Sequence, residues 1–118
     1  MPVIEITSEF EFNEFLNDQS GNKYLFVDFY AQWCGPCKKV APYIHKLSET
    51  YSTVTFLKVD VDVCQTLSEK YGISAMPTFL MFEVGKSKSF KSIVGADVKK
   101  IENALKMLTT IISPKEDF

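Results

Sequence analysis

Apolar residues recur with two different spacings along this chain. Nearly continuous apolar runs over Tyr24–Tyr30 and over residues 54–59 are typical of strands that are covered on both faces. Between these runs, apolar residues three and four positions apart predict a helix with one buried face, made of Cys37, Val40, Ala41, Ile44, Leu47 and Tyr51. Because a strand, a helix and a strand follow one another, the pattern predicts a parallel pair joined by a right-handed crossover.

Shorter signals predict elements on either side of this unit. Val3–Ile6 is predicted as a short strand, and Ser8 with Glu11 three residues later forms a capping box at the start of a helix. Residues 78–82 and a strand within residues 88–94 are predicted to form a hairpin.

Two further helices are predicted in the second half of the chain. The first is short, has Asp62 and Gln65 as candidate caps, and ends at Gly72. The second covers residues 96–112, where apolar residues again step by three and four. Residues 1–118 are therefore interpreted as a single α/β domain, with a mixed five-stranded central sheet flanked by four helices and a polar tail over 113–118.

The composition narrows the class of protein. The chain has 118 residues, 46% of them apolar and ten of them Phe, which indicates one folded domain with an ordinary core. A net charge of −2 gives no reason to expect a nucleic acid or an anionic membrane as partner. Three cysteines form no disulfide framework, and we find neither a leader segment nor an apolar run near the ~18 residues of a membrane span. We therefore expect a cytoplasmic monomer.

Cys34 and Cys37 stand where the strand Tyr24–Tyr30 gives way to a helix. Cβ atoms at this spacing on a helical turn lie roughly 5–6 Å apart, whereas a relaxed disulfide needs roughly 3.5–4.5 Å, so a bridge is feasible but easily reduced. Free N–H groups at the helix start favour an anion, so we predict Cys34 to be an exposed nucleophile with a lowered pKa and the more buried Cys37 to be the resolving thiol. Pro36 fits the first helical turn, and Gly35 leaves the sulfur approachable.

A zinc site is the alternative interpretation of this cysteine pair. It would need Cys64 and His45 as further ligands, but His45 lies eight residues after Cys37 on the same predicted helix, or ~12 Å along its axis. Two ligands do not make a tetrahedral site, and a Cys-x-x-Cys motif beside a strand–helix–strand pattern favours redox chemistry. Cys64 itself is predicted to be a small buried or half-buried residue at a helix start, and a regulatory or dimer-forming role stays open.

The cysteine motif and one later segment resemble the thioredoxin family. The first is Asp28-Phe29-Tyr30-Ala31-Gln32-Trp33-Cys34-Gly35-Pro36-Cys37-Lys38, and the second is Ala75-Met76-Pro77-Thr78-Phe79. The order of elements matches over about residues 3–112. The resemblance implies a thioredoxin fold and an electron-carrying protein-disulfide reductase, whose redox-active Cys34–Cys37 disulfide serves in place of a bound cofactor or metal. It implies a thioredoxin reductase that draws on NADPH, and disulfide-containing target proteins, as partners.

Asp28 lies inside the most apolar strand of the chain. Burial of a carboxylate is costly, so its pKa should rise and it should hold a proton near neutrality. The functional interpretation is a proton relay that helps to deprotonate Cys37, and the alternative is a side chain that escapes to a strand edge. The resemblance implies that the amine of Lys58, on the neighbouring strand, points toward Asp28 and tunes it; otherwise Lys58 would be a surface lysine.

Trp33 is the only tryptophan. Its place in the turn beside Cys34 favours part of a flat apolar docking face over packing in the core. The resemblance implies that this substrate-binding face also includes Gly35, Pro36, Met76 and the loop around Gly95.

The bond between Met76 and Pro77 is expected to be trans from sequence alone, since cis is rare. The resemblance implies cis instead. A cis bond would place the backbone of Ala75 and Met76 beside the sulfurs, where an extended substrate segment could pair with it as an added strand.

Two rival classes are less consistent with these residues. An oxidant or isomerase of similar fold commonly carries His at the position of Pro36. A binding module with a vestigial or zinc-bound cysteine pair has no need of Cys34, Cys37, Asp28 and Pro77 together.

Overall fold

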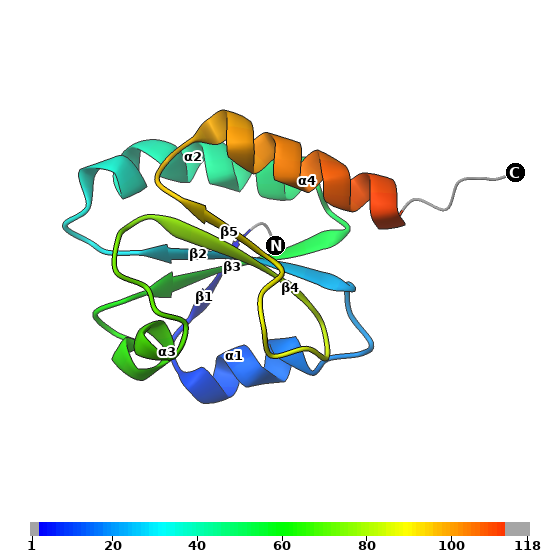
Figure 1. The fold of residues 1–118 in the computed structure, drawn as a ribbon, viewed down its shortest axis with the longest axis horizontal. Helices are drawn as coiled ribbons and strands as arrows, with labels where there is room; N and C mark the ends of the chain where they lie inside the picture. The colour runs from blue at the N-terminus through cyan, green and yellow to red at the C-terminus, as the bar shows by residue number, and fades with distance from the viewer. Residues whose placement is uncertain (1–2, 113–118) are drawn as a thin grey trace, which may run out of the picture.

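Nine elements follow one another over residues 3–112, the part of the chain that the computed structural model describes (Figure 1). They are β1 (Val3–Ile6), α1 (Glu9–Leu16), β2 (Tyr24–Tyr30), α2 (Gly35–Thr50), β3 (Val54–Asp60), α3 (Gln65–Lys70), β4 (Thr78–Glu83), β5 (Lys91–Val94) and α4 (Val98–Ile112). The predicted order and types of these elements are confirmed. The tail predicted over 113–118 lies outside the described residues.

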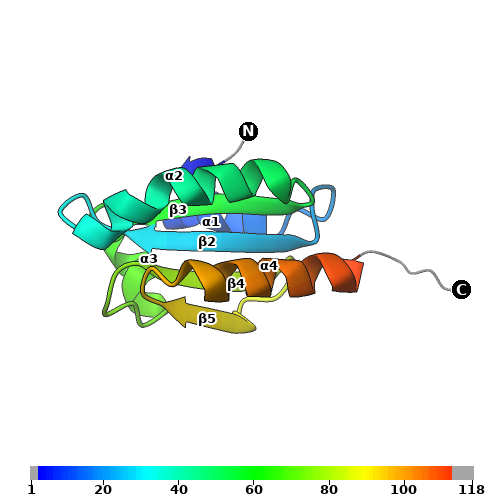
Figure 2. The ribbon, with the colours of Figure 1, turned by 90° about the horizontal axis from the view of Figure 1, so that it is seen from above.

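The five strands form one mixed sheet in the order β1-β3-β2-β4-β5. β3 pairs in parallel with β1 and with β2, whereas β4 pairs antiparallel with β2 and with β5. Helices α2 and α4 lie on one face of the sheet, and α1 and α3 lie on the other (Figures 1 and 2). The predicted parallel unit β2–α2–β3 is confirmed, and β2 occupies the centre of the sheet.

Two apolar clusters cover the two faces of β2. Phe26 packs with Phe56 and Phe79 beneath α2 and α4, at ring-centroid distances of 4.9 and 5.4 Å. On the other face, Phe12 of α1 packs edge-on against Phe82 at 5.5 Å. Burial on both faces explains why β2 is almost continuously apolar, and it encloses any polar side chain that β2 carries.

The face beneath α2 and α4 changes from apolar to charged along the strands. Val3, Phe56 and Phe26 stand in register on β1, β3 and β2 and belong to the apolar cluster on this face. Two residues further along the same three strands, Glu5, Lys58 and Asp28 stand in register. Because side chains alternate between faces with a period of two, this charged row lies on the same face, toward the carboxyl end of β2.

Two of three details at helix ends differ from the sequence prediction. The last helix begins at Val98 because Asp97 accepts a hydrogen bond from the N–H of Lys100 at 3.1 Å. The short helix α3 begins after Cys64, and no side chain caps it, so the capping role predicted for Asp62 and Gln65 is wrong. The predicted cap at Ser8 is confirmed, since its hydroxyl accepts from the N–H of Glu11 at 3.1 Å.

Candidate functional site

Cys34 and Cys37 meet at the N-terminus of α2. A turn closes after β2, where the N–H of Cys34 donates to the carbonyl of Ala31 at 3.2 Å. Cys34 is then the N-cap of α2, and its sulfur accepts from the N–H of Cys37 at 3.1 Å. The two residues are joined by a disulfide with their Cα atoms 5.2 Å apart, within the usual range for such bridges. The predicted bridge at a helix start is confirmed, and Pro36 lies in the first turn as predicted.

The exposure of the two cysteines differs from the prediction. Each retains 5% of its exposed surface, so Cys37 is not the more buried of the two, and the bridge is not exposed in the disulfide form. The physical reason is that each sulfur covers the other and that neighbours close around the pair. Ala31 is buried with the sulfurs, and Val61 and Met76 pack against them.

The segment before β4 lies beside the sulfurs. Its Met76–Pro77 bond is cis, as the resemblance implies, and Met76 packs against the cysteine cluster. The carbonyl of Pro77 accepts from the N–H of Gly95 at 2.8 Å, which ties this segment to the loop after β5. Gly95 adopts a φ of 95°, a conformation that favours glycine. Ala75 and Met76 precede the β4 ladder, which begins at Thr78.

Apolar groups around the sulfurs are exposed. Trp33 keeps 66% of its surface exposed, so the prediction that it does not pack in the core is confirmed. Its indole N–H donates to Asp62 at 2.9 Å, which holds the ring in one orientation. Gly35 and Pro36 are also exposed, and Val94 of β5 is 64% exposed. An apolar surface therefore surrounds a buried disulfide.

Asp28 lies directly beneath this surface. It is only 7% exposed, which excludes the alternative of a side chain that escapes to a strand edge. Among the described residues, its Oδ1 is the one buried side-chain oxygen or nitrogen without a hydrogen-bond partner. Burial raises the pKa of Asp28 to about 7, against a lowering by Lys58 and with a further rise from Glu5. Asp28 and Cys37 line the same cavity of about 120 Å³.

Lys58 lines this cavity too, and its charge lowers the pKa of Asp28, but its ammonium forms an ion pair with another carboxylate, that of Glu5. Its Nζ lies 3.6 Å from Glu5, and 5.7 Å from the ring centroid of Tyr30. The hydroxyl of Tyr30 donates to Glu5, with both carboxylate oxygens at 2.9 Å. Sequence reasoning missed Glu5, because an acidic residue in an edge strand looks like ordinary surface. Only the strand register, which places Glu5 in one row with Lys58 and Asp28, identifies it as part of the site.

The remaining candidate residues do not join this site. Cys64 is buried as predicted, and its thiol donates weakly to the carbonyl of Ile6 at 3.6 Å. Burial, followed by the charges of Glu5 and Asp60, raises its pKa. His45 pairs with Glu49 on α2. Within residues 3–112, no three His, Cys, Asp or Glu side chains gather in an arrangement that could hold a metal ion.

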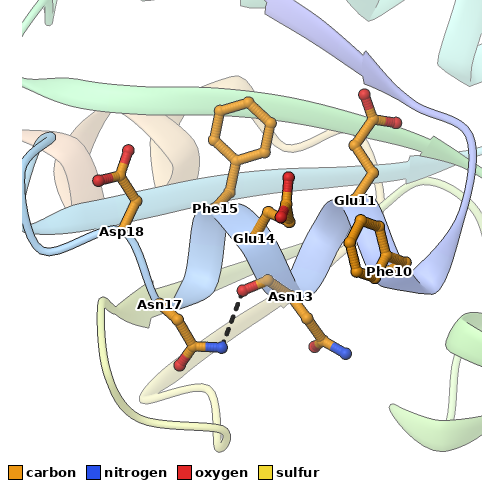
Figure 3. A pocket seen from close by; sticks show the side chains of 7 residues that line it. All are labelled: Phe10, Glu11, Asn13, Glu14, Phe15, Asn17 and Asp18. Atoms are coloured by element: carbon orange, nitrogen blue, oxygen red, sulfur yellow. Dashed lines mark hydrogen bonds between the residues drawn. The ribbon is translucent and has the colours of Figure 1, made fainter.

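A wide hollow on the described surface lies elsewhere (Figure 3). Its volume is about 780 Å³, and its lining comes from α1 and the residues directly after that helix. Phe10, 73% exposed, stands there with the acidic Glu11, Glu14 and Asp18. None of the predicted site residues lines this hollow; Asp28, Cys37 and Lys58 line the smaller cavity of about 120 Å³ instead.

A disulfide-bonded cysteine pair at a helix N-terminus, above a buried carboxyl and in this fold, defines a thiol–disulfide oxidoreductase. Comparison with known proteins agrees. The family model described as Thioredoxin matches residues 3–107. The thioredoxin of Ovis aries is 45% identical over 106 residues, which is 90% of this chain and 98% of that protein. The chain belongs to the thioredoxin family.

Solved structures support the same assignment. A thioredoxin from Nicotiana alata has a TM-score of 0.83 at 36% identity, over 90% of this chain and 91% of that one. A chain solved for the thiol resolving mechanism in yeast mitochondrial 1-Cys peroxiredoxin via glutathione/thioredoxin systems has a TM-score of 0.80 at 33% identity, over 89% and 94%. The predicted fold and the oxidoreductase class are confirmed, and in this family the active-site disulfide serves in place of a bound cofactor.

No helix of the described residues is both long and apolar enough to cross a membrane.

Proposed function

We propose that this chain reduces disulfides in target proteins through Cys34 and Cys37, and that a thioredoxin reductase restores its dithiol. The observation that carries the proposal is the disulfide at the start of α2, where the Cys34 sulfur already accepts the N–H of Cys37 at 3.1 Å. In the reduced protein the same N–H and the positive end of the helix stabilise a thiolate at Cys34. Cys34 is therefore the proposed nucleophile.

The first step exchanges one bond for another. The Cys34 thiolate attacks one sulfur of a target disulfide, a Cys34–target disulfide forms, and the second target sulfur leaves as a thiolate that takes a proton from water. No electrons have left the two proteins at this stage. The helix start stabilises the thiolate before attack, and this keeps the nucleophile ionised near neutral pH.

The second step releases the reduced target. Cys37 loses its proton and attacks the Cys34 sulfur, the disulfide seen in the structure forms, and the other target sulfur leaves as a thiolate. Asp28 is the proposed acceptor of the Cys37 proton, because the two line one cavity and a carboxyl with a pKa of about 7 exchanges protons near neutrality. Over both steps, two electrons pass to the target, the proton of Cys37 goes to Asp28, and the two target thiolates take up protons from water.

Target binding is proposed on the apolar surface around the sulfurs. Trp33, Gly35 and Pro36 are exposed on one side of the pair, and Met76 packs against it on the other. The Ala75 carbonyl accepts from the Thr78 hydroxyl at 2.6 Å, and an extended target segment would pair with the remaining backbone groups of Ala75 and Met76 ahead of β4, as strands add to sheet edges. The hydrogen bond from Gly95 to Pro77 supports the position of this segment.

We further propose that residues 1–118 act as one domain and as a monomer in a reducing compartment, the cytoplasm. A free, buried Cys64 thiol suits such a compartment. Targets of the kind named for the yeast relative, a peroxiredoxin, are reasonable candidates. Neither a nucleic acid nor a membrane is proposed as partner, since the net charge is only −2.

The reduction potential of the Cys34–Cys37 couple tests this function, by equilibration against a dithiol buffer. A value near about −270 mV, typical of thioredoxin, supports an electron donor. A value above about −200 mV would instead assign the chain to the oxidants and isomerases of this fold. A Cys34→Ser variant that keeps disulfide-reducing activity would show that Cys34 is not the nucleophile.

A further inference from the structure

Three charged side chains lie in one row across the sheet, next to the cysteines. Glu5 on β1 pairs in register with Lys58 on β3, and Lys58 pairs in register with Asp28 on β2. In a parallel sheet, residues in register point to the same face and their strands lie about 4.8 Å apart. Lys58 therefore stands between two carboxyl groups, each one strand away.

The ammonium of Lys58 is paired with only one of them. Its Nζ is 3.6 Å from Glu5 Oε1, whereas Asp28 Oδ1 has no hydrogen-bond partner. Glu5 is itself held, because the Tyr30 hydroxyl donates to it, with both carboxylate oxygens at 2.9 Å. Tyr30 belongs to β2, so its side chain crosses β3 to reach β1, and its ring lies 5.7 Å from the ammonium. We call the Glu5–Tyr30 pair the clasp.

Other titratable and charged groups also lie near Asp28, on α2 and β3. Cys37 and Lys38 of α2 line the same cavity as Asp28. Asp60, further along β3, accepts from the N–H of Asp62 at 2.9 Å and from Gln32 at 3.3 Å. β4 contributes only Phe79 in register with Asp28. Glu5 and Lys58 are the two charged groups whose fields act on Asp28, one in each direction.

We propose that Glu5 and Tyr30 are positioning residues, which hold the Lys58 ammonium away from Asp28 and so keep Asp28 ready to take the proton of Cys37. Glu5 and Asp28 compete for the ammonium of Lys58. The hydrogen bond from Tyr30 holds the Glu5 carboxylate where it pairs with that ammonium. This inference rests on the proposed role of Asp28 as proton acceptor. The ring of Tyr30 packs against the cluster of Ala31, Cys34 and Cys37, whereas its hydroxyl is bonded to Glu5. The proposed effect on Asp28 is carried by this hydroxyl and by Glu5, and it passes through Lys58.

The charges give the direction of the effect. Glu5 raises the pKa of Asp28 and Lys58 lowers it, while burial supplies the larger rise. Without the charge of Glu5, the negative field at Asp28 is lost and the ammonium is free to turn toward Asp28. Both changes favour the ionised carboxylate. A carboxylate with a lower pKa is a weaker base, so it takes the proton of Cys37 less readily and release of the target slows.

Titration of the Asp28 carboxyl in the oxidised protein, followed by ¹³C NMR, tests the inference. Glu5→Gln keeps an acceptor for Tyr30 but removes the charge, and we expect the midpoint to fall by about half a pH unit or more, as for unit charges about 10 Å apart in a partly screened site. Tyr30→Phe keeps the charge but opens the clasp, and we expect a smaller fall. Glu14→Gln removes one charge from α1 on the opposite face and should leave the midpoint unchanged.

An unchanged or raised midpoint in Glu5→Gln, with chemical shifts elsewhere like those of the parent chain, would overturn the inference. If Glu5→Gln does not fold, the Asp28 midpoint in Tyr30→Phe is the test, and an unchanged or raised value overturns the inference. A purely structural hydrogen bond would alter stability but would leave the titration of Asp28 unchanged. Lys58→Met should move the midpoint upward, and a fall there would also contradict the arrangement.

A separate measurement distinguishes failure of the proposed role of Asp28 from failure of the inference about Glu5 and Tyr30. The rate of release of a target from the Cys34 mixed disulfide is compared between the parent chain and Asp28→Asn. If the rate is unchanged, Asp28 is not the proton acceptor, and the proposed role of Asp28 fails whatever Glu5 does. If Asp28→Asn slows release but Glu5→Gln leaves both the midpoint and the pH profile of release as they were, only the inference about the clasp fails.

Discussion

Cys34 and Cys64 occupy similar places in the fold and have opposite surroundings. Each is the N-cap of a helix, of α2 and α3 respectively, and each is almost fully buried, at 5% and 6% exposed. The Cys34 sulfur accepts the N–H of Cys37 at 3.1 Å. The Cys64 sulfur makes no such capping bond and instead donates to the carbonyl of Ile6 at 3.6 Å.

The comparison shows that a helix start does not by itself make a reactive thiol. A sulfur that accepts an N–H is stabilised as an anion, whereas a sulfur that donates to a carbonyl is stabilised as a thiol. The charges agree, because burial and then Glu5 and Asp60 raise the pKa of Cys64. α3 is also only six residues long, so its N-terminus offers a weaker field than that of the sixteen-residue α2.

The largest difference between Cys34 and Cys64 is expected when each sulfur is removed in turn. Cys34→Ser should abolish turnover of a protein disulfide, because the hydroxyl neither ionises nor forms the mixed disulfide. Cys64→Ser should leave turnover close to that of the parent chain. Reduction of a disulfide-containing protein at pH 7 measures both, and equal losses would show that the two thiols are not functionally distinct.

The environment of the cysteine pair also predicts a pH-dependent stability. The pKa of Asp28 rises from 3.8 to about 7 on folding, so between these values the folded state binds more protons than the unfolded state, and stability falls as the pH rises. In Asp28→Asn the side chain is uncharged at every pH, so this contribution to the loss of stability is absent. We expect this variant to be more stable than the parent by up to about 4 kcal/mol above pH 7, and by little near pH 4.

Denaturant unfolding of the oxidised proteins at pH 4 and pH 8 measures the difference. Glu14→Gln is a matched control, since it also removes one carboxyl but from the exposed side of α1. A stability difference that is the same at both pH values would contradict a raised pKa at Asp28.

Thiol reactivity should separate the two cysteines by a smaller factor. In the reduced protein at pH 7, we expect Cys34 to be alkylated at least about tenfold faster than Cys64, because a larger share of it is thiolate and the approach past Gly35 is open. Mass spectrometry of peptides after timed exposure to iodoacetamide gives both rates. Cys37→Ser isolates Cys34 from its partner, and faster labelling of Cys64 in that variant would reverse the assignment.

The smallest expected effect is structural. Cys64→Ala removes one buried sulfur that contacts the cluster between the sheet, α1 and α3, and should lower stability by about 1 kcal/mol. Thermal unfolding of oxidised protein measures this change, and the reduction potential of the Cys34–Cys37 couple should stay within error of the parent value. A shifted potential would mean that Cys64 is coupled to the active pair.

The parts of this site that lie close together in sequence were predictable from it. Cys34, Gly35, Pro36 and Cys37 are consecutive, and strand-then-helix periodicity places them at a helix start. Burial of Asp28 also follows from local sequence, because apolar neighbours on both sides of it require a covered strand.

The parts of the site that depend on pairing between strands were not predictable from the sequence. The row of Glu5, Lys58 and Asp28 exists only through the register of three strands that are far apart in the chain. This register places Lys58 beside both carboxyl groups, and its ion pair is with Glu5. The hydroxyl of Tyr30 could be placed only once β1 was known to lie beyond β3. The equal burial of both sulfurs likewise depends on Met76, forty-two residues after Cys34.

The separation of the hollow at α1 from the cysteine pair matters for inhibition, because the two share no lining residue. A compound chosen because it fills a concave site would settle against α1, near Phe10 and Glu14, and would leave the cysteine pair untouched (Figure 3). The surface around Trp33 and Met76, which we propose binds targets, would suit an extended peptide rather than a compact molecule. An effective inhibitor of this chain would therefore be a reagent that captures Cys34 covalently, or a strand-like ligand that carries such a reagent.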